Sequence, residues 1–336
     1  MPAMFEVDQV GKKESLADLI ANVEAAATPF SSMLPKRAKP IQVEHSWQVK
    51  SYRQTGHKGV VDGKDATNFT SQNRVRLRAV TQKSWELPAV SDFAGEATIA
   101  GAPGGEMKHQ IADALVVVKR IIEKRCLSNE DQKLDDGVNQ GNETRGIFQW
   151  VNNSAQTLYP VDADFRTPAA AIYTGALDEF SEAELKAMAR ANYKERHGTS
   201  KLDGFVGIDL KAQITDFASY SDDVTSKTNT RTFTQRADSK MIMRVIDRLN
   251  LDTGQIDLHP ISFGWTDVAT GADSAYTHRS GVFVDLNMVG LMFTRMPSVK
   301  MLPNLGGGEK AIVDVMFMLM CDNPLGHMAV KSNSAS

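Results

Sequence analysis

The sequence predicts an α+β fold, and three observations support this prediction. Residues 103–127 place apolar side chains at helical spacing over a long stretch. Residues 41–53 and 74–80 alternate apolar and polar side chains, which is the period-two pattern of half-buried strands. From residue 241 onward, short β-rich stretches dominate the chain. A helix, a strand pair, a long helix, a mixed middle and a β-rich end follow one another as in an α+β chain.

The first helix is predicted over residues 15–27, where Ser15 can cap the first turn. Thr28-Pro29 should end it, because the residue before a proline is pushed out of the helical region. The chain then becomes basic and enters the first alternating segment.

The two alternating segments predict an extended β-hairpin, joined by the polar, glycine-rich residues 54–73. The apolar face of its first strand consists of Ile41, Val43, His45, Trp47 and Val49. In the second strand, apolar and basic residues alternate: Val75, Leu77 and Ala79 against Arg74, Arg76 and Arg78. An isolated two-stranded hairpin is only marginally stable in water. Its apolar face therefore needs a surface, and two are open: its own domain or a neighbouring subunit.

The charge of the chain is unevenly distributed. The net charge of the 336 residues is −3, but residues 36–88 contain eleven Lys/Arg and four Asp/Glu, a net of +7 that leaves −10 elsewhere. A basic segment on an acidic body fits either nucleic acid or an acidic surface of another copy of the chain. Attraction between +7 and −10 favours a hairpin that reaches a neighbouring subunit.

The long helix over residues 103–127 should present one continuous packing face, formed by Met107, Ile111, Leu115, Val118, Ile122 and Cys126. About 24 residues at 1.5 Å per residue give roughly 36 Å, which is long for a globular domain. A further helix is predicted over 181–197, with Ser181 as its cap and Glu184 completing a capping box.

Motifs for catalysis or metal binding are missing from the sequence. It contains no HExxH, CxxC, GxSxG or GxGxxG pattern. In GHKGVVDGKD (56–65), the glycines are wrongly spaced for a phosphate loop, and Asp65 stands where Ser or Thr should hold magnesium. We therefore expect no enzyme activity, cofactor or metal, with a phosphate-handling enzyme that uses residues 56–65 as the alternative from another class.

Other classes are also disfavoured. No apolar run reaches 18 residues, and the N-terminus lacks an apolar signal core, so neither a membrane span nor that secretion route is expected. Cys126 and Cys321 lie in apolar stretches and are predicted to be buried, reduced thiols. The basic stretch RVRLR has no nucleic-acid-binding motif around it, which leaves only non-specific phosphate contact.

Several short motifs occur in a recognisable order. Thr28-Pro29-Phe30 is followed by His45-Ser46-Trp47-Gln48, the hairpin, the long helix, and ETRGIFQW at 143–150. An AELKAM helix and a DGFVGI strand follow, and the chain closes with NPLGHMAV at 323–330. This order resembles a tailed-bacteriophage major capsid protein of the Hong Kong 97-like fold, over nearly the whole chain. It is most similar to a branch long known only as a domain of unknown function and later recognised as head proteins.

The resemblance implies a division of the chain. Residues 1–40 would be an N-terminal arm, and residues 41–90 would be the E-loop, a hairpin that lies on an adjacent subunit. Residues 91–164 and 286–336 would form the peripheral domain, with 103–127 as its spine helix, and 165–285 would form the axial domain. The 14 residues before the first helix are too few for a fused scaffolding domain, so a separate scaffold or prior cleavage is expected.

The resemblance also implies a function. The chain would be a structural subunit that self-assembles as pentamers and hexamers into the icosahedral head of a tailed phage, in the host bacterial cytoplasm. The head would enclose double-stranded DNA with non-specific contacts only, and scaffolding, portal and decoration proteins would be partners. An encapsulin-type compartment shell is the alternative in the same fold. The expected inter-subunit residues are Trp47, Arg74, Arg76, Arg78 and Lys83, and no residue is singled out for a covalent crosslink.

Overall fold

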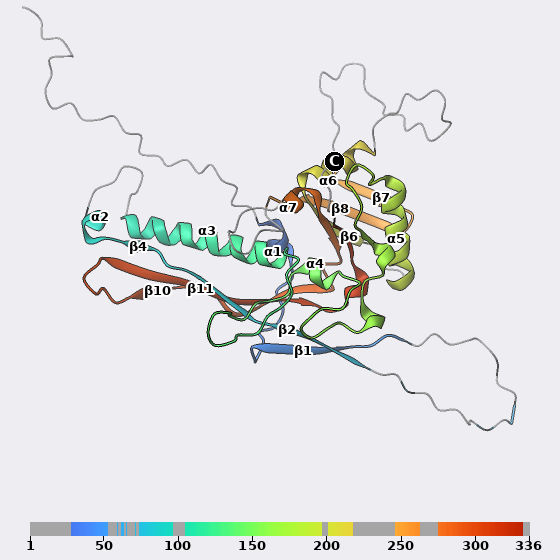
Figure 1. Ribbon diagram of the computed structural model, residues 1–336, viewed down its shortest axis with the longest axis horizontal. Helices are drawn as coiled ribbons and strands as arrows, with labels where there is room; N and C mark the ends of the chain where they lie inside the picture. Colours follow the sequence, from blue (N-terminus) through green and yellow to red (C-terminus); the bar gives the residue numbers. More distant parts are fainter. Residues whose placement is uncertain are drawn as a thin grey trace, which may run out of the picture.

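A computed structural model describes residues 28–52, 59, 62–63, 65, 71, 74–96, 105–196, 201–217, 246–262 and 275–331. The helix expected over 15–27 and most of the phosphate-loop-like segment lie outside these residues. The molecule is elongated, with a long helix on a sheet at one end and a second, more compact layer of helices and strands beside it (Figure 1). A two-stranded ribbon runs along the lower side of this body in that view.

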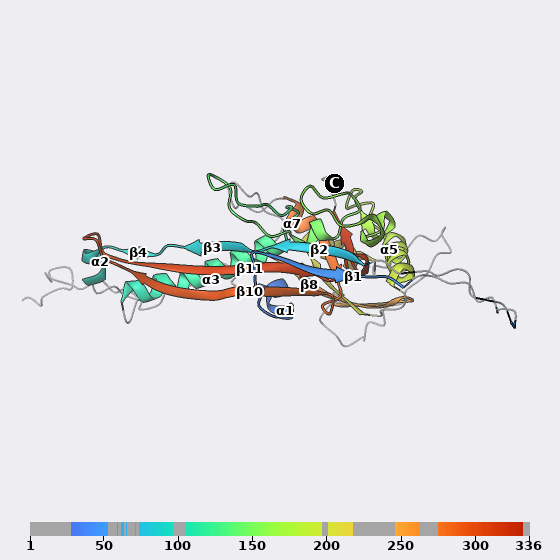
Figure 2. The same cartoon turned by 90° about the horizontal axis from the view of Figure 1, so that it is seen from below.

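The first layer is a four-stranded antiparallel sheet. Its order is β10-β11-β3, and the short strand β4 also pairs with β11. These strands are β3 (Gln82–Glu86), β4 (Ala89–Val90), β10 (Val289–Leu302) and β11 (Glu309–Cys321). The helix α3 (Glu106–Cys126) runs along this sheet (Figures 1 and 2). Alternate residues of β11 are buried in the layer: Ala311, Val313, Val315 and Phe317.

The packing face predicted for α3 lies toward the interior of the molecule. Met107, Val118 and Ile122 are buried, while Ile111 and Leu115 are partly buried and pack against the hydrophobic clusters. Cys126 and Cys321 are both buried and both free, as predicted. The helix α2 (Asp92–Glu96) lies at the far end of the sheet, beside the β10–β11 turn.

The second layer is a six-stranded mixed sheet of order β5-β12-β9-β6-β8-β7. Its strands are β5 (Ile172–Tyr173), β6 (Lys201–Val206), β7 (Arg248–Leu251), β8 (Gly254–Pro260), β9 (Gly281–Val284) and β12 (Met328–Val330). The helices α5 (Glu182–Arg196) and α6 (Ile208–Asp216) pack on one face and form a second core. Because side chains alternate along a strand, neighbouring residues of β6 serve different cores: Val206 lies in this second core and Phe205 in the first.

Short elements connect these layers. They are α1 (Pro29–Met33), α4 (Ile147–Trp150), α7 (Ala275–Arg279), η2 (Ala163–Phe165), η3 (Ala169–Ala171) and η4 (Pro324–Gly326). The Ser181 cap predicted for α5 is confirmed, because its hydroxyl accepts a hydrogen bond of 3.3 Å from the Glu184 amide. Within the described residues, no helix is both long and apolar enough to span a membrane.

The predicted hairpin is present but shorter than expected. Strands β1 (Glu44–Val49) and β2 (Val75–Val80) pair antiparallel, and they are not hydrogen-bonded to either larger sheet. Ile41 lies outside β1 with 92% of its surface exposed, so the strand expected from residue 41 begins three residues later. The hairpin strands end at Val80, because the chain then continues into β3 and pairs with β11. Residues 82–90 therefore belong to the first sheet.

Candidate functional site

The Thr28-Pro29-Phe30 motif attaches the N-terminal part of the described chain to α3. Proline at the first position of α1 fits a helix start, because that position needs no amide hydrogen. The ring of Phe30 is fully buried and meets Phe205 edge to face, with centroids 4.9 Å apart. The carboxylate of Glu123 on α3 accepts hydrogen bonds from the amides of Phe30 (2.8 Å) and Ser31 (2.6 Å). A side chain 92 or more residues away thus caps α1.

Glu123 is fully buried, and this burial raises the pKa of its carboxyl group, although the hydrogen bonds from Ser31 and Phe30 act in the opposite direction. The sequence reasoning missed this residue. No local signal separates it from the other charged residues of α3, because Arg125 is also buried and Lys119 lies nearer to the apolar face by helical spacing.

The ETRGIFQW segment forms a buried polar centre between the hairpin, α3 and the first sheet. Arg145 is completely buried, and its Nε lies 2.7 Å from a carboxylate oxygen of Asp131. Its guanidinium also stacks over the Trp150 ring at 4.6 Å. Gly146 is packed so tightly that an added Cβ would lie 2.1 Å from the carbonyl oxygen of Ser128. These contacts explain why Arg, Gly and Trp occupy their positions in the motif.

The stem of the hairpin lies on this centre. Leu77 and Ala79 are buried, and Trp47 packs against Trp150 with ring centroids 5.8 Å apart. The apolar face of the stem therefore rests on the chain's own core. Trp47, expected to contact another subunit, is placed here against the body of its own chain.

The opposite face of the hairpin carries a stripe of three arginines, Arg74, Arg76 and Arg78, which we call the arginine stripe. Arg74 donates to the side chain of Gln48 (3.3 Å) and Arg76 to Ser46 (2.8 Å). The Arg78 guanidinium lies over a tyrosine ring. Within the described part of the chain, no carboxylate forms an ion pair with any of the three. Lys83, by contrast, lies on β3, where its Nζ stacks over Trp85 at 4.7 Å.

The segments α2, β3–β4 and β10–β11 of the first sheet carry several exposed apolar side chains, and α2 lies beside the β10–β11 turn at the far end of that sheet (Figures 1 and 2). Pairing of β4 with β11 and a hydrogen bond of 3.4 Å between Asn304 and Asp92 hold the two segments together. We call this group the apolar end; its members are Trp85, Leu87, Phe93, Met296, Val299, Met301, Leu302 and Leu305. Phe93 and Leu305 are 94% and 88% exposed, which is unusual for side chains of this size. The sequence reasoning did not single them out.

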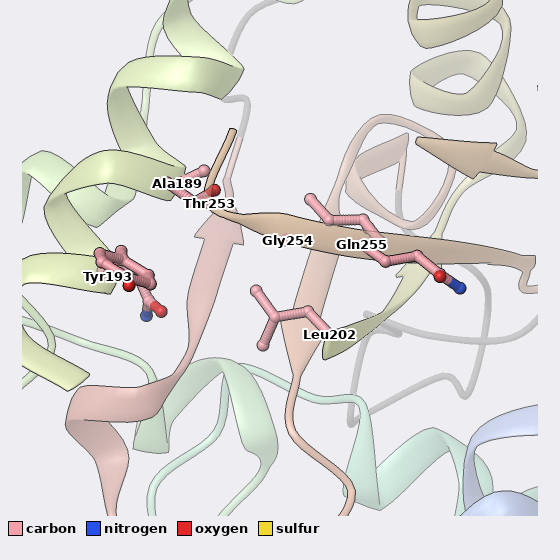
Figure 3. A pocket seen from close by; sticks show the side chains of 8 residues that line it. Ala189, Tyr193, Leu202, Thr253, Gly254 and Gln255 are labelled. Atoms are coloured by element: carbon pink, nitrogen blue, oxygen red, sulfur yellow. The ribbon is translucent and has the colours of Figure 1, made fainter. Parts of the chain in front are cut away.

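The described residues form a small notch and a larger cavity. The notch in Figure 3, between α5 and the β7–β8 turn, has a volume of about 10 Å³ and holds at most about one water molecule. A larger cavity of about 490 Å³ lies between α2, β4 and the start of α3. Among the described residues, no three His, Cys, Asp or Glu side chains are grouped so that they could hold a metal.

Buried ionisable groups elsewhere serve packing. Lys331 is buried, and desolvation lowers the pKa of its ammonium group to about 8 while Nζ donates to the Phe148 carbonyl (2.6 Å). In the NPLGHMAV segment, the Pro324 carbonyl accepts from the Thr167 hydroxyl (2.9 Å), which fixes the segment to the body. The pKa of Asp314 is lowered, because hydrogen bonds from Ser298 and Arg295 outweigh its desolvation.

A family model and several solved structures both relate the chain to phage capsid proteins. The model of the SU10 major capsid protein family matches residues 4–334. No curated protein sequence matches the chain. The capsid of Cyanophage P-SCSP1u is similar in structure, with a TM-score of 0.61, 9% identity and coverage of 96% of this chain and 93% of the other.

Two further solved structures are similar. The mature capsid of bacteriophage PhiM1 gives a TM-score of 0.60 at 10% identity, covering 97% of this chain and 93% of the other. The capsid of a native GTA particle gives 0.59 at 11% identity, covering 98% of each chain. All three are capsids rather than encapsulin-type compartments, so the alternative drawn from the sequence gains no support.

Proposed function

The chain belongs to the SU10 major capsid protein family, and we propose that it builds a phage shell through two separate surfaces of an elongated subunit. It is a major capsid protein with the Hong Kong 97-like fold, and its family and fold are those of structural proteins. The proposal accordingly contains no catalytic step.

The first surface is the arginine stripe, and it is the observation that carries the proposal. Successive arginines on one strand face lie about 7 Å apart, since side chains of the same face recur every two residues. Their partners are the neutral groups of Gln48, Ser46 and a tyrosine ring. Such a row attracts an acidic surface. A neighbouring copy of the chain can supply that surface, because its residues outside 36–88 carry a net charge of −10. The apolar face of the stem stays on its own core, while its arginine face is open to an adjacent subunit.

The second surface is the apolar end. Large apolar side chains that stay exposed on several neighbouring segments commonly become part of interfaces. Because the apolar end and the hairpin strands lie apart along the molecule (Figures 1 and 2), each subunit can contact different neighbours through them. A closed shell needs at least two different contact surfaces on each subunit, because a single self-complementary patch would stop assembly at a dimer.

The remaining assignments follow from the family resemblance. We propose residues 1–40 as an N-terminal arm, 41–90 as the E-loop, 91–164 with 286–336 as the peripheral domain, and 165–285 as the axial domain. The last residues of the E-loop segment, 82–90, join it to the sheet that contains β10 and β11. Subunits would associate as pentamers and hexamers of an icosahedral head around double-stranded DNA. Assembly would take place in the bacterial cytoplasm with scaffolding, portal and decoration proteins.

Charge reversal tests the first surface. The variant Arg76→Glu/Arg78→Glu should assemble more slowly and less completely than the natural chain, most clearly at low salt where charges are least screened. Electron microscopy and light scattering of the purified recombinant proteins measure this. Arg190→Glu is the matched control, because Arg190 is exposed on α5 and pairs only loosely, at 3.5 Å, with exposed Asp252. Equal assembly of the double variant and the natural chain at every salt concentration would refute the role of the arginine stripe.

A further inference from the structure

A loop beside the hairpin stem is held by an ion pair between buried Arg145 and partly buried Asp131. Asp131 accepts hydrogen bonds from the amides of Thr157 (2.9 Å) and Leu158 (3.4 Å). Arg145 donates to the carbonyl oxygens of Leu158 and Tyr159, the latter at 3.2 Å. The two side chains are also paired with each other. Backbone amides and carbonyls of residues 157–159 are thus hydrogen-bonded to the side chains of Asp131 and Arg145.

These hydrogen bonds hold Tyr159 in an unfavourable backbone conformation. Its φ angle is +48°, and it is the one non-glycine residue with positive φ in the described part of the chain. The left-handed region is costly for a residue with a bulky side chain, and it persists only where surrounding contacts enforce it. The direction of the Tyr159 side chain is therefore set by Arg145 and Asp131, not by local preference.

The Tyr159 side chain bridges both strands of the hairpin. Its hydroxyl donates a hydrogen bond of 2.8 Å to the carboxylate of Glu44, the first residue of β1. Its ring lies under the guanidinium of Arg78 on β2, 4.8 Å from the ring centroid. Glu44 pairs with Val80 in the register, and Arg78 lies two residues before Val80, so both contacts fall at the base of the hairpin, where β2 continues into β3.

The other ring contact of the stem depends on the same centre. Trp47 packs on Trp150, and Trp150 is stacked against the guanidinium of Arg145. Arg145 therefore supports the hairpin from two sides, through Trp150 beneath its apolar face and through Tyr159 beside its polar face.

We propose that Tyr159 is a positioning residue that fixes the direction in which the hairpin leaves the body. A six-residue strand is about 20 Å long, so a rotation of about 10° at the stem displaces its far end by about 3 Å. A displacement of that size takes a hydrogen-bonding group out of range of its partner. If the direction of the hairpin is fixed before assembly, less conformational entropy is lost when the hairpin docks on another copy. This inference rests on the proposed function, because it assumes that the hairpin docks on another copy.

The test is a double-mutant cycle with Tyr159→Phe and Glu44→Ala on the unassembled full-length chain. Tyr159→Phe removes only the hydroxyl. Tyr52→Phe is the matched control, because Tyr52 belongs to the same part of the chain and is 80% exposed. Hydrogen exchange is followed at the amides of β1 and β2, and at β10 and β11 as an internal reference.

Each single variant should exchange about fivefold faster at β1 and β2, as expected for one lost hydrogen bond. The double variant should exchange no faster than either single one, because both changes break the same contact. Exchange at β10 and β11, and exchange throughout Tyr52→Phe, should remain unchanged. Unchanged exchange at β1 and β2, additive effects, or equal acceleration in β10 and β11 would overturn the proposal.

Assembly provides a second readout. Tyr159→Phe should assemble more slowly than Tyr52→Phe at equal subunit stability, and equal rates would also overturn the proposal. The docking of the hairpin on another copy and the positioning of the hairpin by Tyr159 can be refuted separately. If charge reversal at Arg76 and Arg78 leaves assembly intact while the exchange cycle behaves as expected, docking of the hairpin is wrong and the contact of Tyr159 with the stem stands.

Discussion

Removing the carboxylate of Glu123 should detach α1 from the long helix. In Glu123→Ala, the amides of Phe30 and Ser31 lose the acceptors that lie 2.8 and 2.6 Å away. Phe30 is fully buried, so water does not readily replace the acceptor at that amide. Glu123→Gln keeps one oxygen in nearly the same place and removes only the charge.

The magnitude follows from two opposing terms. Each buried donor left without a partner costs about 1–3 kcal/mol, and water reaches the part-buried Ser31 amide more readily, so the two donors together cost at most about 6 kcal/mol. Removing a desolvated charge returns part of this, since burial already raises the pKa of Glu123 and so disfavours its ionised form. We expect a net loss of about 2–4 kcal/mol for Glu123→Ala and about 1 kcal/mol or less for Glu123→Gln.

Urea unfolding of the unassembled subunit measures both losses, and hydrogen exchange at Ser32 and Leu34 shows whether α1 has opened. An alanine variant with unchanged stability and unchanged exchange in α1 would refute the capping role. A glutamine variant as unstable as the alanine variant would show that the charge, rather than the acceptor oxygen, holds α1.

The pH dependence has a defined sign. The folded-state pKa of Glu123 is raised above its usual value of 4.5, so the folded protein binds this proton first as pH falls. The natural chain should therefore gain stability relative to Glu123→Gln as pH falls through the folded-state pKa toward 4.5. A constant difference between the two proteins across this range would contradict the assigned shift.

Three further changes have expected outcomes. Gly146→Ala should cost about 3 kcal/mol in urea unfolding, because its Cβ would collide with the backbone of Ser128, whereas Gly141→Ala has no atom within 4 Å and should be nearly neutral. Lys331→Met should raise stability at pH 7 by about 1–2 kcal/mol, since it removes a buried charge. That advantage should shrink as pH rises from about 8 toward 10.5, where the folded natural chain releases the proton before the unfolded chain does. Both cysteine thiols are buried, and desolvation raises their pKa, so alkylation by iodoacetamide should follow unfolding and not precede it.

Local pattern was sufficient for the parts of the fold that local chemistry decides. The apolar period along α3, the alternation in β2 and the Ser181 cap of α5 could all be read from neighbouring residues, because helix and strand geometry fix which positions share a face. The order of short motifs was sufficient for the family. The start of β1 was missed, because Ile41 continues the alternation but is 92% exposed in the subunit.

Contacts between distant residues were decided only by the tertiary structure. Glu123 meets residues 92 and 93 positions away, and Tyr159 meets a residue 115 positions away. The surface beneath the hairpin stem was left open by the sequence, and the structure places the chain's own Trp150 there. The spacing of apolar residues shows which face of a helix or strand is apolar. It does not show which of several apolar surfaces will cover that face. That choice depends on how the layers pack, so the sequence determined the elements and the family, while packing determined how the hairpin is held.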